Sequence, residues 1–327
     1  MSMLVRGAAL AVVVAGLAGS LTAAAQEWKP ERNVEISVGT APGSRQDRTA
    51  RVVEKIWREA KLLPVTHVVV NRPGGGGEIN WTNFARYPGD GHYLALTSPA
   101  MTSNQLLGKS KLTLADVTPL ALLNTGYTTF SVRADSSLKT MADVAVRVKK
   151  DPQSVSFSFG TSIGNALHTT GTLYGHAIGV DARKMKMVVY NASSEAMTSV
   201  LGGHVDILIT SFSTIIAQVQ GGQMRVLGVA APTRNPTFPD VPTFRESGVE
   251  LVFSNWNGMV GTKGITPQQV AYWDAVFAKT VATAEWKETM TKDLQEQVYL
   301  PSAEFGKFLE KEREQYRASF VRLGLVK

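Results

Sequence analysis

A recurring unit of strand, glycine-rich loop and helix constrains the fold of this chain more than any other feature. Residues 33–38 have the pattern of a strand, a Gly/Ser loop follows at 39–44, and a helical pattern starts at Asp47. Residues 65–71 form the next strand pattern, and four glycines at 74–77 precede another helix. This alternation of strands and helices predicts an α/β fold with a parallel sheet.

The pattern starts again after an extended segment at residues 121–132. Further strand patterns lie at 93–97 before this segment and at 154–159, 186–190, 206–210 and 225–230 after it. The sequence after Trp256 is mostly helical and has no sheet of its own, so we expect these helices to pack back on the first lobe. No internal sequence repeat accompanies the recurring architecture.

Two lobes are the expected organisation. A mature chain of about 300 residues exceeds the size at which a single core usually stops growing. We predict a discontinuous lobe 1 of residues 26–127 plus 252–327 and a lobe 2 of residues 128–251. Two chain crossings, near residues 126–130 and 251–255, would join them.

The first 25 residues have the order of a signal peptide. Arg6 precedes an apolar run at residues 8–17, which is too short for a permanent membrane span, and three alanines at 23–25 precede Gln26. This order argues against the alternative of a buried N-terminal helix. We predict cleavage near Ala25 and export to the periplasm.

Charge and composition exclude several classes of protein. The 34 Lys and Arg residues outnumber the 27 Asp and Glu residues, but they form no basic stripe with interleaved aromatics, so we expect no nucleic-acid partner. The absence of cysteine rules out disulfides, thiolate metal sites and cysteine nucleophiles.

The glycines at 74–77 lack a following Gly-Lys-Ser/Thr, and no G-x-G-x-x-G occupies that turn, so no nucleotide cofactor is expected. His168 and His176 could share a helix face, but no third ligand completes a metal site.

Several turns at the predicted carboxyl edges of the strands are rich in Gly, Ser, Thr and Asn. They lie at residues 40–47, 74–78, 97–102, 160–165 and 191–195. Ligands of α/β sheets bind at this edge, and the free N–H groups of helix starts suit an anion such as a carboxylate. Helix caps and turns explain any one of these loops equally well, so both interpretations stay open at this point.

Residues 160–164 raise an enzymatic alternative. Their sequence Gly-Thr-Ser-Ile-Gly fits the G-x-S-x-G nucleophile elbow between a predicted strand and helix, and Ser162, Asp181 and His204 would form the triad. Short Gly/Ser patterns are common by chance, and the acid and the histidine would have to come from strands within about forty residues. A secreted serine hydrolase is therefore the less favoured hypothesis.

Short motifs occur in a specific order along nearly the whole mature chain. They are Ala41-Pro42-Gly43 with Asp47, NRPGGGG at 71–77, GDGHYL at 89–94, residues 160–168, YNA at 190–192, GGHVD at 202–206, GQMRVL at 222–227, FPDVPT at 238–243 and WNG at 256–258. In this order and spacing the chain resembles the Bug-type receptors of the tripartite tricarboxylate transporter group. The resemblance implies a non-enzymatic receptor with a type II periplasmic-binding-protein fold, whose cleft closes on a carboxylate. It also implies delivery to a permease with a large and a small integral membrane subunit.

The resemblance also suggests a set of site residues, because the family holds the ligand carboxylate largely by backbone N–H groups and small hydroxyl side chains of facing loops. With the loops described above, the candidate ligand-binding residues are Ala41, Gly43, Ser44, Arg45, Asp47, Gly76, Ser98, Thr161, Ser162, Asn165, His168, Asn191, Ala192 and Asp206. No cofactor or metal belongs to this set.

Arg45 departs from the family pattern, which usually continues with glycine and small residues before the aspartate. A guanidinium in this loop can hold a carboxylate through two hydrogen bonds, whereas a solvated charge on a loop tip is the alternative. Our hypothesis is that Arg45 binds a second carboxylate or an acidic ring substituent of the ligand.

The sequence therefore predicts a periplasmic receptor for a small di- or tricarboxylate or an aromatic acid, expected to be a monomer. A ligand-sensing subunit of a membrane-bound regulator fits the same features. Tyr127, Phe212 and Trp256 could line an apolar part of the cleft, although we expect each of them to pack in a core.

Overall fold

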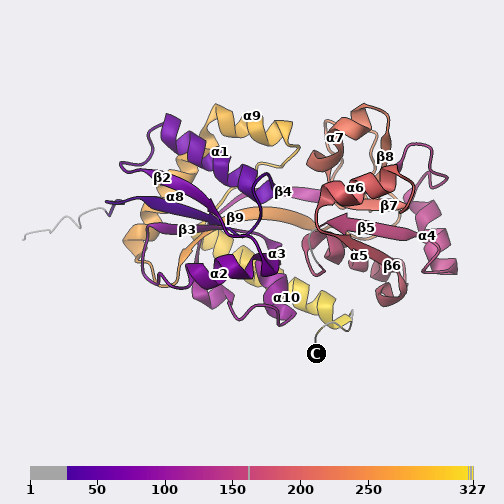
Figure 1. The fold of residues 1–327 in the computed structure, drawn as a ribbon, viewed down its shortest axis with the longest axis horizontal. Helices are drawn as coiled ribbons and strands as arrows, with labels where there is room; N and C mark the ends of the chain where they lie inside the picture. The colour runs from indigo at the N-terminus through magenta and orange to yellow at the C-terminus, as the bar shows by residue number, and fades with distance from the viewer. Residues whose placement is uncertain (1–27, 161–162, 323, 325, 327) are drawn as a thin grey trace, which may run out of the picture.

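The computed structural model describes residues 28–160, 163–322, 324 and 326. The strands are β1 (Val34–Val38), β2 (His67–Asn71), β3 (Tyr93–Thr97), β4 (Val117–Arg133), β5 (Ser156–Gly160), β6 (Lys186–Tyr190), β7 (Ile207–Ser211), β8 (Met224–Val229), β9 (Ser254–Thr262) and β10 (Leu300–Pro301). The α-helices are α1 (Arg45–Glu59), α2 (Glu78–Phe84), α3 (Pro99–Leu106), α4 (Met141–Lys150), α5 (Ala166–Ala177), α6 (Ser193–Leu201), α7 (Phe212–Gln220), α8 (Pro267–Ala282), α9 (Ala284–Lys292) and α10 (Ser302–Arg322). Short 3₁₀ helices are η1 (Gly75–Gly77), η2 (Leu114–Asp116) and η3 (Ala182–Lys184). Figure 1 shows two halves of sheet and helices placed end to end, with β4 and β9 running between them.

The first half is built on strands in the order β2-β1-β3-β9-β4. β1 pairs in parallel with β2 and β3, whereas β9 is antiparallel to β3 and β4. One face of this sheet packs against α1, α8 and α9 around Trp57, Trp273 and Trp286. The other face packs against α2, α3 and the first turns of α10 around Trp81 and Trp256. Because helices cover both faces, the residues of β1, β3 and β9 are buried or half-buried on both sides of the sheet.

The second half is built on β7, β5 and β6, together with the last residues of β4 and with β8. β5 is parallel to β6 and β7, and β4 is antiparallel to β7 and β8. One face carries α4 and α5 around Phe130, Phe157 and Tyr174. The other face carries α6 and α7 around Leu208 and Ile215. The parallel strands of both halves therefore end at the edges that face each other.

One strand serves both sheets. β4 pairs with β9 as far as Tyr127 and with β7 from Thr128 onward. The 17-residue length of β4 thus carries the chain from one half to the other without a loop. The lobe boundaries at 127/128 and 251/252 stay a prediction.

The last helix differs from the expectation that all C-terminal helices pack on the first lobe. Phe305 and Leu309, near the start of α10, belong to the core cluster of the first half. Tyr316 and Phe320, near its end, belong to the cluster of the second half, and the Tyr316 ring lies 5.3 Å from that of Phe253. A helix of 21 residues is long enough to cover both halves, so α10 connects them in addition to the two strands β4 and β9.

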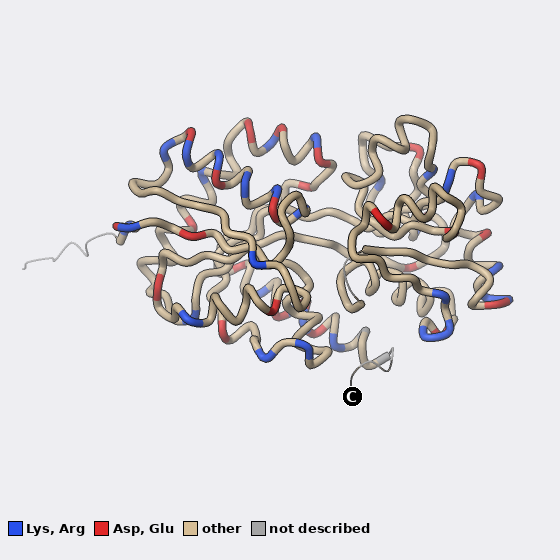
Figure 2. The backbone as a smooth tube through the Cα atoms, in the orientation of Figure 1, with Lys and Arg blue, Asp and Glu red and all other residues tan. Residues whose placement is uncertain are grey.

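The surface charges are mixed. Figure 2 shows basic and acidic residues interspersed over both halves of the molecule. In the described part of the chain, no helix has the length and apolar character that crossing a membrane requires.

Candidate ligand-binding site

The loop between β1 and α1 is organised by two side chains of its own. Ser44 is the N-cap of α1 and accepts a hydrogen bond from the Asp47 N–H. The buried Asp47 carboxylate in turn accepts from the Gly43 N–H at 2.8 Å and from Arg51 Nε at 3.0 Å. Burial alone would raise the pKa of Asp47, but hydrogen bonds from Arg51, Gly43 and Asn71 outweigh it and keep the pKa below its ordinary value. Asp47 therefore shapes the loop, and the Gly43 N–H is already used within it.

The loop after β2 packs directly against this first loop. Gly74, Gly75, Gly76 and Gly77 all have positive φ, which only glycine adopts without strain. A Cβ on Gly39 would lie 3.1 Å from the Gly77 Cα, so the two loops approach closely. The loop that holds the sequence-predicted Gly76 thus packs against the loop that follows β1.

The α3 start completes the first half's group of loops. Asn104 on α3 donates from Nδ2 to the Gly76 oxygen at 2.9 Å. Ser98 caps α3 by accepting from the Ala100 N–H at 3.4 Å. The three predicted loops of this half thus lie together at one edge of its sheet.

The facing edge of the second half carries the loops after β5 and β6. A Cβ on Gly160 would lie 2.2 Å from the Ser193 nitrogen, so these two loops touch. Asn165 is the N-cap of α5, accepting from the His168 N–H at 2.9 Å and donating to the Gly160 oxygen at 2.7 Å. Asn191 and Ala192 precede α6, with the Asn191 side chain exposed. Thr161 and Ser162 lie outside the described residues.

His168 braces its loop as a neutral ring. Its Nδ1 accepts from the Gly164 N–H at 3.2 Å, and its ring lies 5.2 Å from that of Phe159. Burial, and secondarily the positive charge of Lys109, lower the pKa of His168 to about 4. The imidazole is therefore uncharged at neutral pH and supplies no positive charge to a ligand.

A direct contact joins the two halves beside these loops. Lys109, just after α3, donates from Nζ to the Ile163 oxygen at 2.7 Å. A Cβ on Gly164 would lie 2.5 Å from Leu107 Cδ1 of the first half. The candidate residues that the structure describes thus lie in the loops on both sides of this contact, with the exception of Asp206.

Asp206 lies at the opposite edge. It precedes β7 and accepts from the N–H and the hydroxyl of Ser156, at the start of β5, at 2.8 and 2.6 Å. Because parallel strands begin at one edge and end at the other, the residue before β7 is remote from Gly160 at the end of β5. Asp206 ties two strand starts together, and the structure does not bring it to the other candidates.

Arg45 is half-buried and extends from the α1 start toward the crossing strands. Its guanidinium donates to Asn255 Oδ1 at 2.8 Å and to the Trp256 main-chain oxygen at 3.3 Å, and Gln295 Oε1 lies at 3.5 Å. Burial, and then the charge of Arg48, lower the pKa of Arg45 to about 10, so it stays protonated at neutral pH. The guanidinium is therefore not a solvated charge on a loop tip.

The three aromatic candidates have other contacts. Trp256 is fully buried with its ring 5.5 Å from that of Phe305, and Phe212 stacks on Phe238 at 5.1 Å. Tyr127, at the crossing, donates its hydroxyl to Glu296 Oε2 at 3.1 Å. Trp256 and Phe212 thus pack in cores, as the sequence led us to expect.

One polar loop escaped the sequence analysis. Ser211 ends β7, and its Oγ lies 3.1 Å from Ser213 Oγ and 3.2 Å from Thr214 Oγ1 at the start of α7. Ser211 pairs with Thr128 on β4, so this loop joins the same sheet edge. The run Thr-Ser-Phe-Ser-Thr at 210–214 follows a predicted strand and could have been recognised by the same rule as the other loops.

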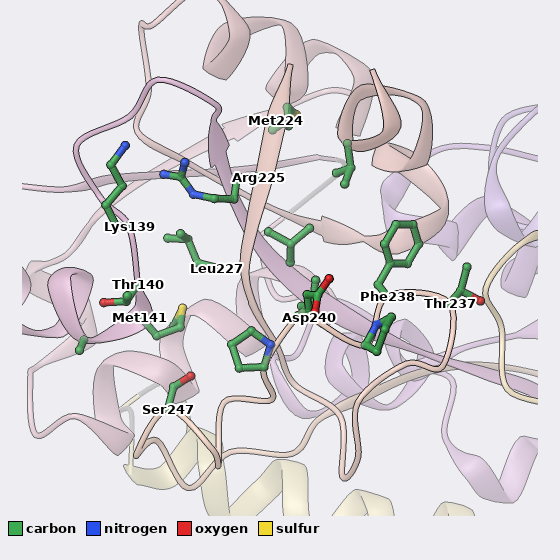
Figure 3. Close-up of a pocket in the computed structure, with 16 residues that line it drawn as sticks. Lys139, Thr140, Met141, Met224, Arg225, Leu227, Thr237, Phe238, Asp240 and Ser247 are labelled. Atoms are coloured by element: carbon green, nitrogen blue, oxygen red, sulfur yellow. The ribbon is translucent and has the colours of Figure 1, made fainter. Parts of the chain in front are cut away.

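Two open cavities lie elsewhere on the molecule. A cavity of about 680 Å³ opens beside β8 and the start of α4, and Figure 3 shows Lys139 and Arg225 at one end of it. Arg225 donates to the main-chain oxygens of Ala134, Ser136 and Leu138, so it supports the chain after β4. A second cavity of about 360 Å³ lies beside α2. None of the candidate residues lines either cavity, and among the described residues no group of three His, Cys, Asp or Glu side chains is placed to hold a metal ion.

Comparison with known proteins gives consistent matches over nearly the whole chain. The model of the tripartite tricarboxylate transporter family receptors matches residues 49–325. The UPF0065 protein in the gbd 5′ region of Cupriavidus necator is 28% identical over 324 residues, which cover 98% of this chain and 96% of that protein.

Solved structures agree in fold. The periplasmic binding protein BugD is 26% identical, with a TM-score of 0.78 over 91% of this chain and 99% of its own. A protein of R. palustris solved with adipate is 20% identical, with a TM-score of 0.80 over 90% of this chain and 98% of its own. The mixed α/β architecture is thus that of periplasmic binding proteins.

Proposed function

The chain belongs to the tripartite tricarboxylate transporter receptor family, and from this premise we propose that it captures a small carboxylate between its two lobes and delivers it to a membrane transporter. The observation that carries this proposal is the facing arrangement of the loops. Helix starts after β1, β2 and β3 lie in the first half and helix starts after β5, β6 and β7 lie in the second, and Lys109, which follows the end of α3, contacts Ile163 in the loop before α5 across the two halves. Such helix starts offer N–H donors and positive dipole ends to an anion.

Ligands of structural neighbours support the carboxylate class. The R. palustris protein named above was solved with adipate, and MatC from Rhodopseudomonas palustris was solved with malate at 21% identity and a TM-score of 0.75. Both ligands carry two carboxylates. The likeness in sequence is too low to transfer either ligand to this chain, so the proposal is limited to small carboxylates.

The family consists of solute-binding receptors that are not enzymes, which removes the serine-hydrolase alternative. The structure adds a reason against the suggested triad. Asp181 caps η3 and accepts two hydrogen bonds from Arg183, at 2.9 and 2.8 Å, instead of orienting a histidine.

In the proposed mechanism, the ligand enters between open lobes and one carboxylate takes the donors at the α1 start, near Ala41 and Ser44. Asn165 and Asn191, with Thr161 and Ser162, would complete its hydrogen bonds from the second lobe. Bending at the crossings near residues 126–130 and 251–255 would close the site. Donors already positioned by helix starts reduce the entropy lost on binding.

The proposed setting is the periplasm, after removal of residues 1–25. The partners would be the large and the small integral membrane subunits of a tripartite transporter. A sensor subunit that reports to a membrane-bound regulator is the second candidate, because it would use the same site. Copurification with the membrane fraction separates these two candidates by the partner that is recovered.

Thermal unfolding of the purified mature protein tests the ligand class. Mono-, di- and tricarboxylates are added at millimolar concentration, with the corresponding amides as controls of equal shape. A ligand present at 100 times its Kd stabilises the folded state by about 2.7 kcal/mol, which raises the melting temperature measurably. No shift with any carboxylate, or equal shifts with the amides, would refute the proposal.

A further inference from the structure

Arg45 carries a half-buried positive charge that has no anionic partner in the described part of the chain. The Asn255 side chain and the Trp256 main chain accept its hydrogen bonds, and Gln295 lies nearby, but all three groups are neutral. Neutral acceptors satisfy N–H groups, yet they do not replace the solvation that a buried charge has lost. An anion placed against the guanidinium would supply that missing interaction.

The surrounding charges increase this positive surplus. Arg48 follows three residues later on α1 and adds a second positive charge close enough to perturb the Arg45 pKa. Asp47 is the carboxylate nearest in sequence, but it forms its ion pair with Arg51. The start of α1 contributes the positive end of the helix dipole. The local field thus attracts a negatively charged group.

The guanidinium also occupies a position between the helix-start donors and the crossing strands. Asn255 on β9 pairs with Gly126 on β4, where the two strands run from one half to the other. A Cβ on Gly126 would lie 2.8 Å from Gln295 Oε1, so the Gln295 amide covers the crossing. Ser44, the N-cap of α1, directly precedes Arg45 in the chain. A ligand held at the α1 start therefore has this guanidinium within reach of its far end.

On the basis of the function proposed above, we propose that Arg45 makes the receptor selective for ligands with two carboxylates, by binding the second one. The planar guanidinium would donate two parallel N–H groups to that carboxylate and give up its longer contacts with the Trp256 oxygen and Gln295. Asn255, at the shortest distance, would keep the guanidinium oriented. A short linear dicarboxylate is the chemical class that this arrangement selects.

Calorimetric titration with matched pairs of acids tests the inference. Succinate, glutarate and adipate are compared with butyrate, pentanoate and hexanoate, which have the same chain lengths and one carboxylate. The proteins are the wild type, Arg45→Gln, Arg45→Lys and the control Arg58→Gln. Arg58 lies near the other end of α1 and is paired with Glu54, so its replacement removes one charge from the same helix at an exposed place.

We expect the wild type to bind the best diacid more tightly than its matched monoacid by about tenfold to hundredfold, the range for a lost charge-assisted contact. Arg45→Gln should abolish this preference while leaving monoacid affinity within about threefold, and Arg45→Lys should keep part of it. Arg58→Gln should bind as the wild type does. A preference that survives in Arg45→Gln, or an equal loss for monoacids and diacids, would overturn the inference and leave the receptor function standing. Binding of none of these acids by the wild type would overturn the inference of a linear dicarboxylate, whereas the proposed function is refuted separately, by the thermal-unfolding screen with the wider set of carboxylates.

Discussion

Glu312 makes the stability of this protein depend on pH in a direction opposite to that of most carboxylates. Its side chain lies on α10 between the two core clusters that this helix covers, and only 6% of the residue is exposed. Oε1 accepts a hydrogen bond from Trp256 Nε1, whereas Oε2 has no hydrogen-bond partner among the described residues. Burial raises the pKa of Glu312 to about 8, because the polar interactions with Trp256 and Thr102 only partly offset the lost solvation.

The sign of the effect follows from the two protonation equilibria. The pKa is higher in the folded than in the unfolded protein, so the folded state binds this proton more tightly. The stabilisation is fully present below the ordinary value of 4.5 and is lost as the pH rises through about 8. At 1.36 kcal/mol per pH unit, the loss amounts to about 5 kcal/mol between these limits.

The replacement Glu312→Gln removes the titration while keeping the shape and the Trp256 contact. Urea unfolding at intervals from pH 5 to pH 9 gives the free energy of unfolding of both proteins. The wild type should lose stability relative to Glu312→Gln at up to about 1.4 kcal/mol per pH unit, with the difference levelling off above pH 8. The difference between the two free energies of unfolding removes the contributions of the other titrating groups, because both proteins contain them.

Glu310→Gln is the matched control on the same helix. Glu310 is exposed and paired with Arg313, so its removal should change the free energy of unfolding by about 1 kcal/mol or less at every pH. Parallel stability curves for the wild type and Glu312→Gln would show that Glu312 titrates normally, and the reasoning from its burial would be wrong.

Two further predictions concern the loops. Asn191→Asp should weaken carboxylate binding by about tenfold or more through like-charge repulsion. The control Asn235→Asp adds the same charge in a loop of the second half outside the candidate set and should leave the affinity unchanged. Calorimetric titration of both variants with the same carboxylate measures the difference. Gly160→Ala should destabilise the protein by about 1–3 kcal/mol, because its Cβ would meet the Ser193 nitrogen at 2.2 Å. Gly306→Ala, inside α10, should stabilise the protein by about 1 kcal/mol, because its Cβ would lie at an ordinary contact distance of 3.8 Å from Pro119 Cγ. Urea unfolding in which both alanine variants change the free energy of unfolding in the same direction would contradict this explanation.

The parallel strands of both halves were predictable because each is a short segment with β-branched, aromatic or other apolar residues, bounded by turn residues. The strand predicted at 93–97 matches β3, and that predicted at 186–190 matches β6. β9 escaped prediction, since its sequence Ser-Asn-Trp-Asn-Gly-Met-Val-Gly-Thr contains small and polar residues that are unusual in a strand. Packing explains them: a Cβ on Gly258 would lie 2.4 Å from Phe305 Cζ, so an α10 side chain fills the space above this strand.

The candidate site was predictable as a set of loops, but not in the roles of its charged residues. Arg45 and Asp47 lie two positions apart in the first turn of α1, and sequence alone makes both of them candidate ligand contacts. The Asp47–Arg51 pair has the i, i+4 spacing that a helix brings together, so the neutralisation of Asp47 could have been inferred. The partners of Arg45 are more than 200 residues away and carry no charge, which no local pattern reveals. What distinguishes the two residues is therefore the charge balance around the start of α1: the carboxylate of Asp47 is paired with Arg51, whereas the guanidinium of Arg45 has no anionic partner among the described residues, and on this difference our proposal for Arg45 depends.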